Sequence, residues 1–128
     1  MQIAHVALWT QDLEQCANFW KSYFDCTIAE EYVSQNRHGF KSRFVKLPKG
    51  PAIELMCGPW LTAENAPTAE QVGWAHIAIS LGSEESVRAL AKQFERDGLL
   101  VSQPRFTGDG FYEAVAQTLD GILVEITS

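Results

Sequence analysis

The chain opens with the apolar run IAHVALW at residues 3–9, and a close copy, GWAHIAIS, returns at residues 73–80. Sliding the sequence on itself by 71 residues aligns the two runs and sets His5 on His76 without a gap. Each run is apolar enough for a buried strand, and each keeps one histidine. The sequence therefore contains an internal repeat, and each half begins with a strand that contains a histidine.

The same shift continues to the ends of both halves, where it aligns IEL around Glu54 with VEI around Glu125. The glutamate follows the histidine by 49 residues in each half. The apolar neighbours of each glutamate must point to the opposite side of a strand, because side chains alternate between the two faces. The repeat thus keeps one histidine and one glutamate per half.

The bulk composition indicates a globular protein. The chain has 128 residues, of which 46% are hydrophobic and 20% charged, so we expect one domain over 1–128, with module 1 at about 1–58, a connector at about 58–72 and module 2 at about 73–128. The net charge of -6 disfavours nucleic acid and anionic membranes as partners. The sequence has no transmembrane run and no signal segment, and its three cysteines lack metal-finger spacing, so we expect a cytoplasmic protein with reduced thiols.

Local patterns predict the same elements in both halves. A strand at 2–9 leads into a helix capped by Asp12, and a strand at 73–81 leads into a helix capped by Ser83 and ended by Gly98. Three β-prone runs follow each helix. They are expected at 27–34, 40–47 and 52–57 in the first half, and at 99–104, 111–118 and 122–127 in the second.

Two βαβββ modules, opened by AHVA and AHIA and closed by IEL and VEI, resemble the vicinal oxygen chelate superfamily, which includes glyoxalase I, extradiol dioxygenases and bleomycin-sequestering proteins. The resemblance covers essentially the whole chain. The segments at 39–56 and 107–127 are similar to small bacterial glyoxalase-like proteins. The resemblance implies an α+β fold in which two tandem modules form one curved, eight-stranded mixed sheet with helices on its outer face.

The resemblance also implies metal ligands at His5, Glu54, His76 and Glu125. Nitrogen and oxygen donors without thiolates suit a divalent transition metal, Zn or Ni first, with Fe, Mn or Co as alternatives. One ion per site would keep two coordination positions for water or substrate oxygens. In a single half, a rim histidine and a solvent-facing glutamate would explain the residues as well. The repetition of the pair favours ligands.

The function implied is that of a metal-dependent lyase or isomerase of the glyoxalase I type, acting on a small-molecule substrate. The metal would polarise a carbonyl as a Lewis acid, and Glu54 or Glu125 would be the general base. Two alternatives stay open: a non-catalytic drug-binding protein of the bleomycin-resistance type, and an extradiol-type dioxygenase. We also expect a homodimer, whose sites lie either within one chain or across the interface.

Four further residues are candidates for substrate binding: Trp9, Arg43, Arg105 and Tyr112. Trp9 stands where bacterial glyoxalase I has an arginine that helps to hold glutathione, and Gly58 stands where an asparagine is expected, so glutathione specificity is not implied. Arginine can hold a carboxylate or phosphate by two hydrogen bonds, although surface arginines are usually solvated. His38, in the polar loop SQNRHG, is expected to be an exposed loop residue.

Overall fold

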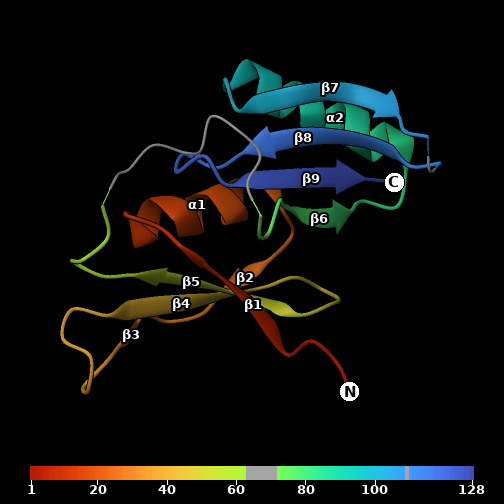
Figure 1. Cartoon of the computed structure of the whole chain (residues 1–128). Coiled ribbons are helices and arrows are strands. Elements are labelled where there is room, and N and C mark those ends of the chain that lie inside the picture. Colours follow the sequence, from red (N-terminus) through yellow and green to blue (C-terminus); the bar gives the residue numbers. More distant parts are fainter. Residues whose placement is uncertain (63–71, 109) are drawn as a thin grey trace. The chain divides into compact units, whose positions relative to one another are not determined.

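The computed structural model describes residues 1–62, 72–108 and 110–128 (Figure 1). The chain divides into two compact units, Met1–Glu64 and Asn65–Ser128, and each contains one half of the sequence repeat. The boundary between the units falls in the connector predicted at about 58–72, most of which lies outside the described residues. The organisation as a single domain of two modules stays a prediction.

The first unit is a five-stranded sheet with one helix. Its strands are ordered β1-β5-β4-β2, and β3 also pairs with β4. β1 and β5 are parallel, whereas the other pairs are antiparallel. The elements are β1 (His5–Trp9), α1 (Leu13–Tyr23), β2 (Thr27–Ile28), β3 (Tyr32–Val33), β4 (Lys41–Lys46) and β5 (Ala52–Cys57).

The second unit repeats this topology in a four-stranded sheet. Its strands are ordered β6-β9-β8-β7, with β6 parallel to β9 and the remaining pairs antiparallel. The elements are β6 (Ile77–Ser80), α2 (Glu84–Arg96), β7 (Leu100–Phe106), β8 (Tyr112–Gln117) and β9 (Leu123–Thr127). The predicted α+β class and the twofold βαβββ order are confirmed.

One strand differs from the prediction. The strand expected at 27–34 is split into β2 and β3, because three residues lie opposite two residues of β4 between the pairs Ile28–Val45 and Tyr32–Ser42. The described residues form nine strands in two hydrogen-bonded sheets, one in each unit.

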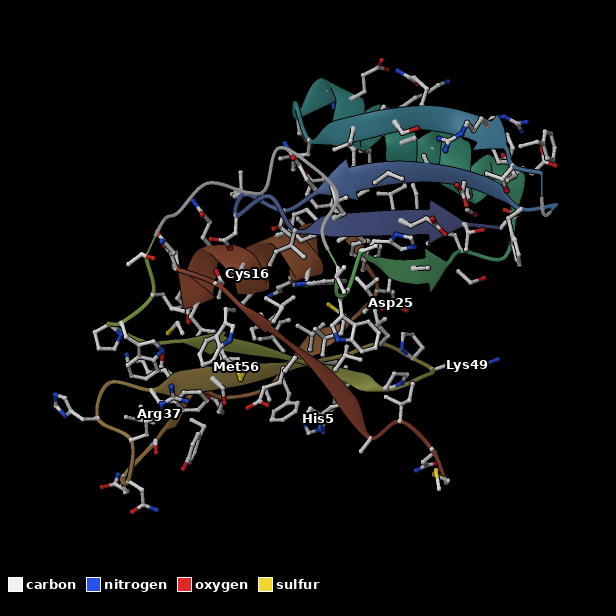
Figure 2. The ribbon with its side chains drawn as sticks, in the orientation of Figure 1. His5, Cys16, Asp25, Arg37, Lys49 and Met56 are labelled. Atoms are coloured by element: carbon white, nitrogen blue, oxygen red, sulfur yellow. The ribbon has the colours of Figure 1, made fainter. Side chains whose placement is uncertain are left out.

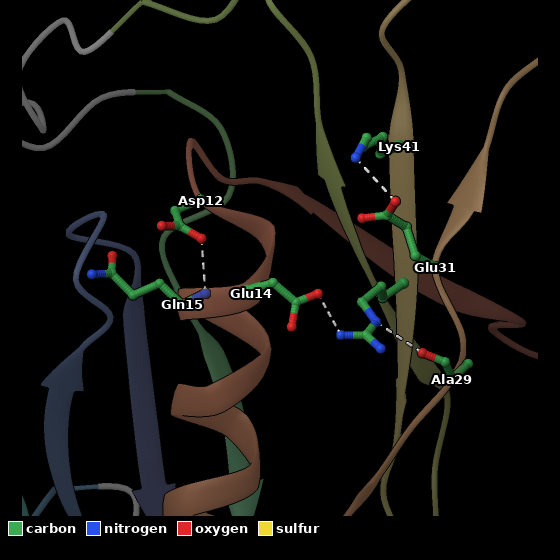
Figure 3. Close-up of polar contacts among 7 residues, drawn as sticks. Asp12, Glu14, Gln15, Ala29, Glu31 and Lys41 are labelled. Carbon is green, nitrogen blue, oxygen red and sulfur yellow. Dashed lines mark hydrogen bonds and ion pairs between the residues drawn. The ribbon is translucent and has the colours of Figure 1, made fainter.

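Both helices begin at the predicted caps. The Asp12 side chain accepts the backbone N–H of Gln15 at 2.9 Å (Figure 3), and the Ser83 side chain accepts the N–H of Ser86 at 3.1 Å. These bonds satisfy N–H groups that have no partner inside the first turn. After α2, Gly98 adopts a positive φ of 73°, which ends the helix as predicted. No helix among the described residues is long and apolar enough to cross a membrane.

Each sheet has one face covered by its own helix (Figure 1). In the first unit this face carries Val45, Ile53 and Leu55, all at most 1% exposed, and α1 packs its buried aromatic residues over it. In the second unit, Val124 and Ile126 are fully buried on the corresponding face. Residues of intermediate exposure alternate with them along β5 and β9, so the opposite face is the one that exposes polar groups.

The contrast between the two faces of β5 predicts how substitutions affect stability. Replacing the buried Leu55 by Ala should lower the free energy of unfolding by about 2–5 kcal/mol, because it leaves a cavity under α1. The matched variant Met56→Ala, one residue further and on the other face, should cost less than half as much. Urea unfolding followed by circular dichroism measures both values. Equal losses would contradict the assignment of the faces.

Candidate functional site

The parallel pairing of β1 with β5 brings the first histidine and glutamate together. Glu54 lies opposite Ala7, and His5 lies opposite Ala52, so the two side chains are diagonal neighbours on the same face of the sheet. His5 is at the start of β1 (Figure 2). Its Nε2 atom is 3.7 Å from Oε2 of Glu54. Both residues lie on the face opposite the one that packs against α1, as the alternation around Glu54 predicts.

The second unit builds the same pair from the same pairing. Glu125 lies opposite Ala78, and His76 immediately precedes β6. Nε2 of His76 is 3.4 Å from Oε2 of Glu125. In both pairs the carboxylate is mostly covered, with 17% and 15% of the Glu54 and Glu125 side chains exposed, whereas the imidazoles are nearly half exposed. The two halves of the sequence repeat therefore also share their local structure, including the contact between the histidine and the glutamate.

The geometry of each pair is compatible with two ligands of one metal ion. Imidazole and carboxylate ligands bond such ions at about 2.0–2.2 Å, which places their donor atoms roughly 2.8–3.8 Å apart for ordinary bond angles. The observed separations of 3.7 and 3.4 Å lie in this range. Within the part of the chain that the structure describes, no third histidine, cysteine, aspartate or glutamate joins either pair. Each unit thus presents two candidate ligands of the predicted types.

An apolar side chain lies beside each carboxylate. Phe44 of β4 is the partner of Glu54 across the sheet, and its ring contacts the ring of His5 edge-on, with centroids 5.6 Å apart. In the second unit Val115 of β8 holds the equivalent position opposite Glu125. Each carboxylate therefore has an apolar residue as its direct neighbour across the strands.

Arg43, a predicted substrate-binding residue, lies on the helix-covered face of its sheet. It is the cross-strand partner of the buried Leu55, and its guanidinium donates to the Glu14 carboxylate of α1 at 2.6 Å and to the Ala29 carbonyl at 3.0 Å (Figure 3). The bond to Ala29 satisfies a carbonyl where the ladder between β2 and β4 is interrupted. Arg43 therefore lies on the opposite face from His5 and Glu54, and it links α1 to the sheet.

Arg105 and Tyr112, the two candidates in the second unit, lie on opposite faces of their sheet. Arg105 pairs with Glu113 across β7 and β8, with Nη2 and Oε1 3.7 Å apart, and it also contacts the Ser102 hydroxyl. Through Glu113 it shares the face of Glu125. Tyr112 is buried on the helix-covered face, where the guanidinium of Arg88 lies 4.5 Å from its ring centroid. The alternation in YEAVAQ, with alanines on the helix side, was the signal that Glu113 rather than Tyr112 faces the site.

Trp9 belongs to an aromatic cluster that the sequence revealed only in part. Trp9 shares the face of His5, and its ring contacts the rings of Phe40 and Trp60 edge-on, with centroids 6.1 and 6.2 Å apart. Arg37 comes from the loop between β3 and β4 (Figure 2). Its guanidinium lies over these rings. Trp9, Phe40, Trp60 and Arg37 are called the aromatic cluster below. Arg37 was missed because no local pattern distinguishes it in its polar loop, and the neighbouring His38 is exposed as predicted.

None of the three cysteines forms a disulfide. Partial burial raises the pKa of the Cys26 thiol, and the nearby Asp25 carboxylate adds to this effect. Burial also raises the pKa of Cys57, which outweighs the opposite effect of Lys41. A raised pKa leaves less thiolate at neutral pH.

A comparison with protein families identifies the fold. The family model of the Glyoxalase/Bleomycin resistance protein/Dioxygenase superfamily matches residues 2–126. The chain belongs to this superfamily. No curated protein matches the sequence.

Solved structures of superfamily members have the same fold. A glyoxylase/bleomycin resistance protein/dioxygenase domain from Frankia sp. EAN1pec superposes with a TM-score of 0.83 at 16% identity, over 99% of this chain and 96% of that one. The trypanothione-dependent glyoxalase I of Leishmania major gives 0.75 at 16% identity, over 98% and 85%. A glyoxalase I variant from Zea mays gives 0.74 at 19% identity over 98% of this chain, which spans only 44% of the maize chain. These likenesses establish the fold.

Trp9 and Gly58, the two positions at which the sequence is expected to differ from bacterial glyoxalase I, both lie at the aromatic cluster. Trp9 is one of its members, and Gly58 lies against the ring of Trp60. A Cβ atom on Gly58 would overlap that ring, so only glycine leaves room for it. Trp9 and Gly58 therefore belong to one local structure around Trp60.

Arg43 and Arg105 have different surroundings, so replacing each by Gln should change the free energy of unfolding by different amounts. Arg43→Gln should lower the free energy of unfolding by about 1–3 kcal/mol, because it removes the bonds to Glu14 and Ala29 under partial burial. Arg105→Gln should change it by no more than about 0.5 kcal/mol, since this side chain is 54% exposed. Chemical unfolding of both variants tests this, and a larger loss for Arg105→Gln would contradict it.

Proposed function

We propose that the protein is a metal-dependent, glyoxalase-like lyase or isomerase that moves a proton at a carbon next to the carbonyl group of a small substrate. The observation that carries the proposal is the repeated His–Glu pair, with Nε2 and Oε2 atoms 3.7 and 3.4 Å apart in the two units. Membership of the superfamily supports it. Two unrelated surface ion pairs would have no reason to recur at equivalent positions in both halves.

His5, Glu54, His76 and Glu125 would together hold one divalent ion, Zn or Ni first and Fe, Mn or Co as alternatives. The set of two imidazoles and two carboxylates suits these ions. When bound, such an ion supplies Lewis-acid polarisation of the substrate carbonyl. The site would lie within one chain or across a homodimer, and both the homodimer and the cytoplasmic location stay predictions.

The protein side chains would carry out the proton transfer. Glu54 or Glu125 would take the proton from the carbon and return it, since a carboxylate positioned at the reacting carbon is an effective general base. Phe44 and Val115 are the cross-strand neighbours of the two carboxylates and place an apolar side chain beside each of them. The imidazoles of His5 and His76 would fix the position of the carboxylates through the contacts described above.

The superfamily also includes bleomycin resistance proteins and dioxygenases. A protein that only binds a drug needs no metal ligands, so two intact His–Glu pairs favour a catalyst. A ferrous dioxygenase site typically combines two histidines with one carboxylate. The second glutamate would occupy a position that oxygen activation requires, which favours proton transfer.

Elemental analysis tests the metal site. Untagged protein purified without chelator should contain about one equivalent of a divalent transition metal per chain, and the double variant His5→Ala/His76→Ala should contain none, because imidazole nitrogens are strong ligands of these ions. His38→Ala, which removes an exposed histidine outside both pairs, is the matched control and should retain the metal. Two equivalents per chain would show that the pairs do not share an ion. Metal-free wild type that takes up none on titration would overturn the proposal.

Exchange of the substrate proton tests the base. A panel of α-hydroxycarbonyl compounds and thioesters is incubated in D₂O, and deuterium at the carbon next to the carbonyl is followed by NMR. Glu54→Gln or Glu125→Gln should slow the exchange at least about 100-fold, because an amide cannot accept the proton. Glu95→Gln, which alters an exposed carboxylate of α2 outside both pairs, is the control. Unchanged exchange in both single variants would rule out the glutamates as bases.

A further inference from the structure

Arg37 differs from every other arginine of the chain. Arg43, Arg88, Arg96 and Arg105 each lie within 4.0 Å of a carboxylate oxygen. Arg37 has no such partner among the described residues, although the chain carries sixteen acidic side chains against ten basic ones. Its guanidinium instead lies over the rings of Trp9, Phe40 and Trp60.

The rings hold the guanidinium without using its hydrogen-bond donors. The Cζ atom of Arg37 is 4.1 Å from the centroid of Trp60 and 5.6 Å from those of Trp9 and Phe40. A guanidinium stacked on a ring face keeps its N–H groups at the edge, where they can bind a carboxylate by two parallel bonds. Stacking also reduces the conformational freedom that the side chain loses on binding. Arg37 is thus prepared to bind an anion.

Two glycines allow the cluster to form. A Cβ on Gly58 would overlap the ring of Trp60, as described above. Gly39, two residues after Arg37, has a φ of 79°, and a Cβ there would lie 2.6 Å from the ring of Pro59. The turn that carries Arg37 can approach the segment that carries Trp60 because Gly39 lacks a side chain, and Gly58 leaves room for the Trp60 ring within that segment.

The aromatic cluster lies on the same face as the first His–Glu pair. Trp9 follows His5 by four residues on β1, so their Cα atoms are about 13 Å apart along the strand. Trp9 and Trp60 are each 40% exposed, which is a large apolar area beside a cation. One small molecule can reach both the cluster and the pair.

We propose that the substrate is a small carboxylic acid with an apolar body. Arg37 binds the carboxylate, Trp9 and Trp60 pack against the apolar body, and the other end of the molecule lies at His5 and Glu54. Only the position of this second end rests on the proposed function. The carboxylate and the apolar body are assigned by the aromatic cluster itself.

The test uses 3-phenylpropionate and its uncharged amide, 3-phenylpropionamide, as probes. Each is titrated into the full-length protein, as purified and again after dialysis against EDTA, while the indole N–H signals are followed by NMR. We expect the signals of Trp9 and Trp60 to shift and that of the fully buried Trp20 to stay. The acid should bind about tenfold more tightly than the amide, with a dissociation constant of about 0.1–1 mM.

Matched variants assign the effect to Arg37. Arg37→Gln should bind the acid as weakly as the amide, and Arg37→Lys should bind it with intermediate affinity, because lysine keeps the charge without the planar fork. Gly58→Ala should weaken binding of both probes by displacing Trp60. Arg96→Gln, which removes an exposed arginine outside the cluster, should bind like wild type.

Several outcomes would overturn the proposal. These are equal affinity for acid and amide, unchanged binding by Arg37→Gln, or no saturable binding below about 10 mM. Binding that disappears after EDTA would assign the carboxylate to a metal instead of Arg37. If Arg37→Gln converts a dimer to a monomer in sedimentation, the anion that Arg37 binds is a carboxylate of a second copy. A protein that lacks metal but passes the titration would refute the proposed function and leave this proposal intact.

Discussion

In each unit the first strand pairs in parallel with the last, and the His–Glu pair exists only because of that pairing. Parallel neighbours need a long crossover connection, which here consists of a helix and antiparallel strands. The crossover keeps the helix on one face of the sheet. The residues 49 positions apart in sequence then meet on the face that the helix leaves uncovered.

Because side chains alternate along β5 and β9, the residues that stabilise the core and the candidate site residues lie on opposite faces of each sheet. On β5 and β9 the buried residues point to the helix, and the glutamates between them point the other way. The apolar face can therefore be optimised for packing while the other face carries charged groups, since each side chain belongs to only one of them. A shift of one residue in either ladder would bury a carboxylate against a helix and expose its apolar neighbours.

The arginines show how context decides the role of a residue. Arg43 bonds to a helix carboxylate and to an interrupted ladder, Arg105 pairs with a neighbour across the strands, and Arg37 lies on three rings. All three stand in polar or β-prone segments of similar appearance in the sequence. Nothing in their local patterns distinguishes a residue that supports packing from one that is free to bind an anion, because the partner comes from a distant segment in each case.

The sequence by itself determined the repeat, the order of elements, the helix caps and the histidine and glutamate of each half, because these depend on periodicity and on local hydrogen bonds. It also determined the face of Glu54 and Glu125, through their apolar neighbours. Only the tertiary structure showed the break between β2 and β3, the separate ladders of the two halves, the burial of Tyr112 and the position of Arg37. Each of these depends on which segments meet across the fold, and such contacts leave no mark in any single stretch of sequence.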